Sequence, residues 1–451
     1  MKHLSVFRGG FTRLAAQEAA GASLRGLSQL VDKALLRRDP ITGRYSIHEL
    51  LRQYAEEQLK YSLQEELSAH ERHAQYFASF MKTCGVHMHD SRQKATFPEI
   101  EADIDNIRVA WNYWSDQQNA KHLLEFVDAM WVFFEVHGSF TPAIQFFGEV
   151  ANKLTAKDVE IVCARAHLRA RQAWFTALIG LPDEGLRLAQ ESISTLKQYN
   201  SPDIVVDAYS CVTINAIFMN NFSVLFQTVE DMIERAKQSG DPWDRGLALI
   251  WQAFAYLVQQ QVDKATQAGQ EGLATFEQLE NPFGVSVATG LILGAISIAA
   301  GNSRDAKAYF LRGVQAAKEI QYQRLLQISY DNLGTVALLE KEIAQAEQFF
   351  LRSLRISQES GQTREMLASL RDLASVYMAY GNLDDALRLL AVVLKHPASD
   401  QNSLNRPERL RDEAEKLRMQ IERELDMASY RFAWEGGQNQ RLADVVTRIL
   451  N

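Results

Sequence analysis

Cysteine is scarce in this chain of 451 residues, which contains only Cys84, Cys163 and Cys211. Three scattered cysteines form neither a disulfide framework nor a metal-binding knot, so a reducing cytoplasm is expected. No charged stretch followed by an apolar core and a cleavage site opens the chain, which argues against secretion. Positive charge is not in excess either, since 48 Lys and Arg face 56 Asp and Glu. This balance argues against a dedicated nucleic-acid-binding protein.

The chain also lacks the short motifs of common catalytic sites. It contains no Gly-x-x-x-x-Gly-Lys-Ser/Thr loop, no nucleophile elbow and no zinc-binding helix motif. The segment His87-Met-His89-Asp90 has no further Cys or His cluster nearby, so we interpret it as a solvated loop. We therefore expect no enzyme activity, no metal and no cofactor in this chain alone.

Long uncharged stretches are rare. One runs from Phe283 to Ala300, and its length is at the lower limit for a helix that crosses a membrane. It contains three glycines, Ser286, Thr289 and Ser297, and it falls where a repeat helix belongs. The pattern favours a buried helix over a membrane span.

What the chain has is an internal repeat. Seven turns end in a small or apolar residue, and the steps between these residues are 42, 40, 40, 41, 40 and 40. The residues are Ala143, Gly185, Leu225, Ala265, Ala306, Ala346 and Ala386. A period of this size predicts stacked helical hairpins, each of which buries its apolar face against its neighbours.

The last three units carry a recognisable motif. Leu333-Gly334 precedes Ala346 by twelve residues and Phe350 follows it by four, which is the spacing of a tetratricopeptide repeat. The earlier units keep the period but lose the motif, as at Leu225. The predicted fold class is all-α: a tetratricopeptide-like solenoid of about seven 40-residue units over residues 121–395. A loop and capping helices are expected over residues 396–451, with a break at Gly436-Gly437.

The first 61 residues are not a repeat. Phe7-Arg-Gly-Gly-Phe11 is a predicted turn, and Thr12 and Ser23 are predicted helix N-caps. Two short strands flank the turn at residues 39–43, and a helix follows from His48. Helices, a hairpin and a further helix predict a partial winged-helix domain with a small β-hairpin.

Three segments carry a specific resemblance, namely Leu4 to Thr12, Leu27 to Leu36 and Tyr45 to Ala55. They resemble the winged-helix arm of the signal-transducing STAND NTPases, in bacterial regulators of the large ATP-binding type. The run from His70 to Trp111 resembles their helical linker, which we place at residues 62–120. The ending Phe432-Ala-Trp434-Glu-Gly436 also recurs in such regulators.

The resemblance implies a switch in which a winged-helix arm closes over ADP and a repeat sensor releases it. A histidine at the start of the helix after the wing reaches the ADP phosphate in that family, and His48 matches its position. The phosphate-binding loop of the NTPase is missing here, and Met1 falls inside the first winged-helix helix. The chain thus looks like the C-terminal part of a longer regulator, or a product that has lost its NTPase domain. ADP or ATP is expected only with such a domain, in the same or another chain.

The family's repeats bind ligands along the concave face of the first helices. That pattern, carried onto this chain, gives six candidates for binding a protein, peptide or small-molecule inducer. They are His167, Trp174, Asp207, Phe254, Asp331 and Arg371. Mixed aromatic and charged groups suit a peptide or a small polar ligand.

Two other functions stay open. The chain could be a free-standing adaptor that assembles other proteins in its groove, without a membrane partner. It could also be a DNA-binding transcriptional regulator that uses four arginines on or near the wing, namely Arg37, Arg38, Arg44 and Arg52. Four arginines without a wider basic patch are a small electrostatic footprint, so DNA binding is the weaker alternative.

Overall fold

The computed structural model describes residues 1–199, 201–400 and 409–451, and omits the side chains of residues 202–205 and 207. The described chain is almost wholly helical, which confirms the predicted all-α, tetratricopeptide-like solenoid. It divides into two compact units. The N-terminal unit comprises Met1–Phe133 and Gln145–Arg169, and the C-terminal unit comprises Phe134–Ile144 and Ala170–Asn451. The domain boundaries drawn from the sequence remain a prediction.

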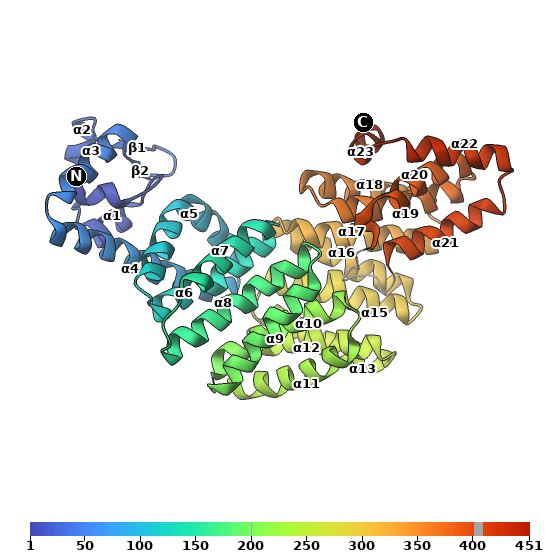
Figure 1. The fold of residues 1–451 in the computed structure, drawn as a ribbon, viewed down its shortest axis with the longest axis horizontal. Coiled ribbons are helices and arrows are strands. Elements are labelled where there is room, and N and C mark those ends of the chain that lie inside the picture. Colours follow the sequence, from blue (N-terminus) through green and yellow to red (C-terminus); the bar gives the residue numbers. More distant parts are fainter. Residues whose placement is uncertain (200, 401–408) are drawn as a thin grey trace. The chain divides into compact units, whose positions relative to one another are not determined.

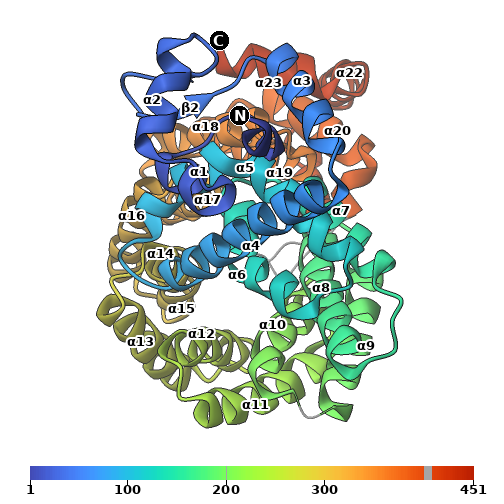
Figure 2. The ribbon, with the colours of Figure 1, turned by 90° about the vertical axis from the view of Figure 1, so that its left-hand side faces the viewer.

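The N-terminal unit begins with short elements that pack on long helices. In Figure 2, the 3-10 helix η1, α1 and α3 lie along α4. The elements are η1 (Lys2–Val6), α1 (Arg13–Ala20), α2 (Leu24–Asp32), β1 (Arg37–Arg38), β2 (Tyr45–Ser46), α3 (Glu49–Lys60), α4 (Leu63–Met88) and α5 (Gln93–Asp116). Three further helices have residues in both units: α6 (Ala120–Val136), α7 (Phe140–Lys153) and α8 (Val159–Leu178).

The predicted caps and hairpin occur in the N-terminal unit. The Thr12 side chain accepts a hydrogen bond from the Ala15 amide at 3.1 Å, and Ser23 accepts one from Gly26 at 3.1 Å. Each bond satisfies one amide that the first helical turn leaves without a partner. Strands β1 and β2 pair antiparallel, and Phe11 adds a bridge to Tyr45. The elements thus follow the predicted order of helices, a hairpin and a further helix.

Polar residues of α5 hold the Gly9-Gly10 turn and the hairpin. Asn106 donates to the Gly10 carbonyl at 2.8 Å and accepts from the Arg8 amide at 2.7 Å. Arg44, at the hairpin, forms a two-bond ion pair with Asp103 at 2.7 and 2.9 Å. A Cβ on Gly10 would lie 3.1 Å from the Tyr45 carbonyl oxygen, so a side chain there would crowd the backbone of the hairpin. Asp103 and Asn106 thus have a structural role in this unit.

The C-terminal unit is a stack of helical hairpins in chain order (Figure 1). After α8 its elements are α9 (Pro182–Gln198), α10 (Pro202–Phe218), α11 (Phe222–Ser239), α12 (Pro242–Val258), α13 (Val262–Gln278), α14 (Pro282–Val287), the π-helix η2 (Ala288–Leu293), α15 (Gly294–Ala299), α16 (Ser303–Glu319), α17 (Gln323–Leu339), α18 (Ile343–Glu359), α19 (Thr363–Ala379), α20 (Leu383–Lys395), the 3-10 helix η3 (Pro397–Asp400), α21 (Leu410–Glu422), α22 (Met427–Gln438) and α23 (Leu442–Leu450).

All seven predicted turns form, and each begins with a residue in the left-handed conformation. The positive φ angles belong to Gly138, Gly180, Asn220, Gln260, Gly301, Lys341 and Gly381. In this conformation the next amide bonds back to the helix, as when Asn302 donates to the Ser297 carbonyl at 2.9 Å. The turn geometry therefore persists where the sequence motif does not, as at Asn220 and Gln260.

The Gly and Phe positions of the repeat motif meet between helices. A Cβ on Gly334 would lie 2.5 Å from the Phe350 ring, and one on Gly294 would lie 2.2 Å from Phe310. The two helices of a hairpin can approach this closely only because the glycine has no side chain. Leu225, which stands where the later units have the alanine that closes the turn, is fully buried like those alanines.

The C-terminal helices correct one prediction. No break occurs at Gly436 and Gly437, because α22 continues through both. A Cβ on Gly437 would lie 2.4 Å from the Arg388 carbonyl oxygen, so this glycine permits close packing on α20. The loop predicted at the start of residues 396–451 contains η3, and residues 401–408 lie outside the described residues.

One helical stretch of the described chain, Pro282–Ala299, is long and apolar enough to cross a membrane by length and composition. In the structure it runs through α14, η2 and α15 and packs against α13, α16 and α17. It therefore occupies the place of a first repeat helix, as predicted. Here Gly290 and Gly313 lie so close that a Cβ on Gly313 would be 2.5 Å from the Gly290 Cα.

His73 makes the stability of the N-terminal unit depend on pH. Its ring is fully buried against Phe7 and Phe77, at centroid distances of 5.1 and 4.8 Å. Burial lowers the pKa of His73 to about 3, because the charged ring would lose its hydration. In the unfolded chain the pKa lies near the usual value for histidine, about 6.5. Since the unfolded state binds the proton more tightly, stability is fully present above that pH and is lost as the pH falls.

We expect the N-terminal unit to lose about 2 kcal/mol of stability through His73 between pH 7 and pH 5, at about 1.4 kcal/mol per pH unit. His73 Nε2 lies 3.4 Å from Asn106 Oδ1. His73→Gln stays uncharged and can keep this bond, so it should remove this part of the pH dependence. Hydrogen exchange of α4 amides at both pH values measures the effect, with His87→Gln as the control. An unchanged pH dependence in His73→Gln would contradict the assignment.

Candidate functional site

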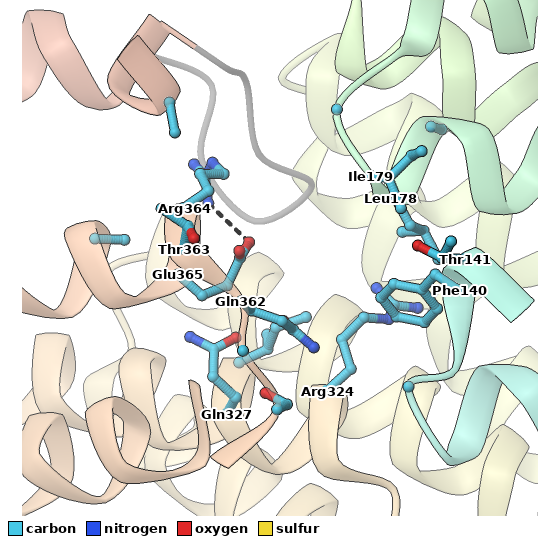
Figure 3. A pocket seen from close by; sticks show the side chains of 18 of the residues that line it. Phe140, Thr141, Leu178, Ile179, Arg324, Gln327, Gln362, Thr363, Arg364 and Glu365 are labelled. Carbon is cyan, nitrogen blue, oxygen red and sulfur yellow. Dashed lines mark hydrogen bonds and ion pairs between the residues drawn. The ribbon is translucent and has the colours of Figure 1, made fainter. Parts of the chain in front are cut away.

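A pocket of about 410 Å³ lies within the C-terminal unit. Its walls come from the turn before α7, the end of α8, the first half of α17 and the turn between α18 and α19. In Figure 3, Phe140, Thr141, Leu178 and Ile179 lie on one side, and Gln362 to Glu365 lie on the other. The volume falls in the range of small-molecule sites.

A buried charge cluster stands beside the pocket. Glu135, near the end of α6, is fully buried and pairs with Arg324, which also lines the pocket. Arg324 Nε donates to Glu135 Oε1 at 2.8 Å, and the Tyr322 hydroxyl donates to the same oxygen. Trp174 Nε1 donates to the other carboxylate oxygen at 2.8 Å. The carboxylate is thus satisfied by three side chains from α8 and the start of α17.

The ionisation states in this cluster follow from burial. Burial raises the pKa of Tyr322 well above its usual value. The hydroxyl therefore stays protonated and can donate its hydrogen bond to Glu135. For Arg324 burial acts to lower the pKa, but the adjacent Glu135 carboxylate outweighs it and the pKa is raised. Arg324 therefore stays charged. It joins residues that are 189 positions apart in the chain.

Several donors around the pocket have no acceptor among the described residues. The amides of Thr363, Arg364 and Glu365 open α19, whose N-cap Gln362 makes no side-chain cap bond. Arg324 Nη1 makes no hydrogen bond in the described chain, although its side chain is only 10% exposed. Arg364 Nε is buried without a partner there as well, while Arg364 Nη1 donates to Glu365 at 3.2 Å.

Acceptors lie on the same walls. Gln327 is 96% buried, and its amide nitrogen donates to Ser353 at 3.0 Å. Its oxygen Oε1 accepts no hydrogen bond from the described residues. Asp331, four residues further along α17, is also buried and lines the pocket. The apolar share of the lining comes from Phe140, Ile179 and Ile328.

The structure brings one of the six predicted ligand residues, Asp331, to this pocket. Trp174 contributes to the charge cluster instead, and Phe254 is half-buried in α12 outside the pocket lining. Arg371 pairs with Glu413 of α21 at 2.7 Å, so a C-terminal helix occupies the position expected for a ligand. His167 is buried within the N-terminal unit. The side chain of Asp207 lies outside the described residues.

Sequence reasoning missed Glu135, Arg324 and Arg364. A signal for Glu135 exists, because it is the one charge in the apolar run Ala129-Met-Trp-Val-Phe-Phe-Glu-Val136. A carboxylate in such a run requires a buried partner. Its partner in the distant α17 could not be inferred from spacing.

His48 is exposed at the N-cap of α3 in the N-terminal unit. Its Nδ1 accepts a hydrogen bond from the Leu50 amide at 3.3 Å. A neutral imidazole that accepts at Nδ1 carries its proton at Nε2, and Nε2 bonds to no described residue. The proton-bearing nitrogen therefore remains able to donate to an external acceptor beside a helix N-terminus.

The remaining predicted features are accounted for by local contacts. Two of the four arginines near the wing are paired internally, Arg44 with Asp103 and Arg52 with Glu49 and Glu56. The predicted loop at His87 is wrong, because α4 extends to Met88 and His89 is its C-cap. Met88 is fully buried, which explains why the helix continues.

No known family model and no curated protein matches the chain. Among solved structures, it is similar to a STAND protein with a tetratricopeptide repeat sensor from Pyrococcus horikoshii, at 14% identity and a TM-score of 0.60. The match covers 99% of this chain and 64% of that one, so the chain spans less than two thirds of the relative's length. The likeness shows a shared fold.

Two weaker likenesses have TM-scores below 0.5. The apo quorum sensor NprR from B. thuringiensis is 11% identical, with 79% of this chain and 97% of that one covered and a TM-score of 0.48. BtubC from P. vanneervenii is 17% identical and has a TM-score of 0.40, and the match covers 53% of this chain and 92% of that one.

The Glu135–Arg324 pair should dominate the stability of the contact between the first and sixth hairpins. Glu135→Ala and Arg324→Ala should each cost about 3–5 kcal/mol, because each leaves a buried charge without its partner. The double variant should lose at least about 1 kcal/mol less unfolding free energy than the two single variants lose together. Urea unfolding of the four proteins measures this coupling. The exposed pair Arg187–Glu191 is the control and should couple by less than about 0.5 kcal/mol. Additive losses at Glu135 and Arg324 would refute the coupling.

Proposed function

We propose that this chain is the regulatory and sensor portion of a STAND-type signalling protein, with its inducer site in the C-terminal unit. The observation that supports this proposal is a pocket whose lining residue Arg324 also pairs with the buried Glu135. The likeness in fold to a STAND protein with a repeat sensor, along nearly the whole chain, agrees with it. The switched NTPase domain would lie in the same or another chain.

The signal would begin at Arg324. A ligand that engages its Nη1 changes the environment of a guanidinium whose other nitrogens hold Glu135. Glu135 lies one residue before the end of α6, and α6 continues by covalent connection into the N-terminal unit. Ligand binding would therefore alter the position of α6 and, through it, the winged-helix arm. In this arm His48 would donate from Nε2 to a phosphate of bound ADP.

The adaptor function remains the alternative, since a pocket of this kind serves a binding scaffold as well. A DNA-binding role has less support from the contacts. Arg44 and Arg52 are held by carboxylates, which leaves Arg37 and Arg38 as exposed charges on the wing. Two arginines neutralise few phosphates.

Occluding the pocket should abolish inducer binding without unfolding the chain. Thr141 is exposed at the second position of α7 and lines the pocket, so Thr141→Trp places a large ring at its mouth. Ala344→Trp is the matched control, since Ala344 is exposed at the second position of α18 outside the pocket. A thermal-shift screen of small molecules should yield compounds that stabilise the wild type and Ala344→Trp but not Thr141→Trp. If every stabilising compound acts equally on Thr141→Trp, the site is wrongly placed.

His48→Ala should weaken ADP retention and raise basal output in a complete protein that includes the NTPase domain. The expected cause is the loss of the Nε2 donor to phosphate. ADP release can be followed with a fluorescent nucleotide, and His87→Ala, in the last turn of α4, serves as the control. Unchanged nucleotide release together with unchanged output would exclude the role of His48.

A further inference from the structure

Helix α3 presents an apolar stripe that is open to solvent. Leu50, Tyr54 and Tyr61 are 69%, 62% and 83% exposed. They follow one another at steps of four and seven residues, and the C-cap Tyr61 keeps helical dihedral angles, so the three side chains lie on one face. Ala55 and Leu59 are buried on the opposite face and hold the helix to its unit. Large apolar side chains in a row at helical spacing are typical of a helix that binds a partner.

A carboxylate lies in the middle of this α3 stripe. Glu57 comes three residues after Tyr54 and four before Tyr61, so it shares their face. Its carboxylate is exposed and forms no hydrogen bond or ion pair with another residue of the described chain. Lys60 lies toward one margin of this face, so the charge at its centre is negative. A free carboxylate between two tyrosine rings suits a guanidinium, which can pair with the carboxylate and stack on a ring.

The wing of the same unit carries complementary groups. The side chains of Arg37 and Arg38 in β1 are exposed and form no hydrogen bond or ion pair within the part of the chain that the structure describes. Ile41, in the turn between β1 and β2, is 93% exposed, more than any other large apolar side chain among the described residues. The ion pair of Arg44 with Asp103 fixes the hairpin to α5, so the wing presents these side chains on a firm support. Because the α3 stripe is open to solvent, the wing of the same chain does not cover it.

We infer that the α3 stripe binds the wing of a second copy of this chain. Ile41 of one copy packs on Leu50 and Tyr54 of the other. A wing arginine pairs with Glu57 and stacks on the Tyr61 ring. Under two-fold symmetry each wing binds the stripe of the other copy, so the dimer is closed and no third copy adds. Pairing of two stripes would instead bring the two Glu57 carboxylates into one apolar contact and leave the wing arginines unpaired.

Charge reversal with complementation tests this dimer, measured by sedimentation equilibrium of the full chain. The contact is small, so the wild type should dimerise with a dissociation constant of roughly 10–100 µM. Arg37→Glu/Arg38→Glu gives an acidic wing and Glu57→Arg gives a basic stripe. Each variant alone repels itself and should dimerise at least roughly tenfold more weakly. Mixed in equal amounts, the two variants present opposite charges at both contacts and should dimerise again.

Arg423→Glu/Arg431→Glu is the matched control, because it makes the same change in net charge as the wing variant, at exposed arginines of the C-terminal unit. It should dimerise like the wild type. A wild type that stays monomeric at roughly 200 µM would overturn the inference and leave the stripe to another partner, such as the NTPase domain. So would a mixture that fails to restore the dimer, or a control that loses it to the same extent. The pocket test with Thr141→Trp does not depend on any of these results.

Discussion

The ion pair between Glu135 and Arg324 is the constraint on which the candidate site depends. A solenoid normally has contacts only between neighbouring repeats, yet this pair joins the first hairpin to the sixth. Both charges are buried, so neither is stable there without the other and the bonds from Tyr322 and Trp174. The pocket exists where these two distant segments meet. Arg324, which maintains their contact, also lines the pocket.

The repeats supply the rigid walls. Left-handed residues end the first helix of every hairpin, and glycines under Phe310 and Phe350 set the close spacing of the later ones. This packing leaves few ways for a hairpin to deform internally, so each hairpin is expected to move as a whole. In the N-terminal unit, Asp103 and Asn106 hold the hairpin and the preceding turn to α5 in the same manner.

The fold was predictable where its causes are local. Thr12 and Ser23 are caps because their hydroxyls reach amides three residues away. The 40-residue period is visible in the spacing between successive turns. The break predicted at Gly436-Gly437 was wrong because helix propensity there is outweighed by packing on α20. Of the predicted ligand residues, Asp331 reaches the pocket, whereas Arg371 is paired with Glu413 from a helix that folds back on α19.

The sequence by itself therefore determined the helical hairpins, their number and the places where they turn, since periodicity and capping act within a few residues. Only the tertiary structure decided which hairpins meet and what their meeting encloses. Arg324 and Glu135 are 189 positions apart, and no spacing in the chain relates them. A lone charge in an apolar helix indicates that a partner must exist. The packing of the four intervening hairpins selects the partner.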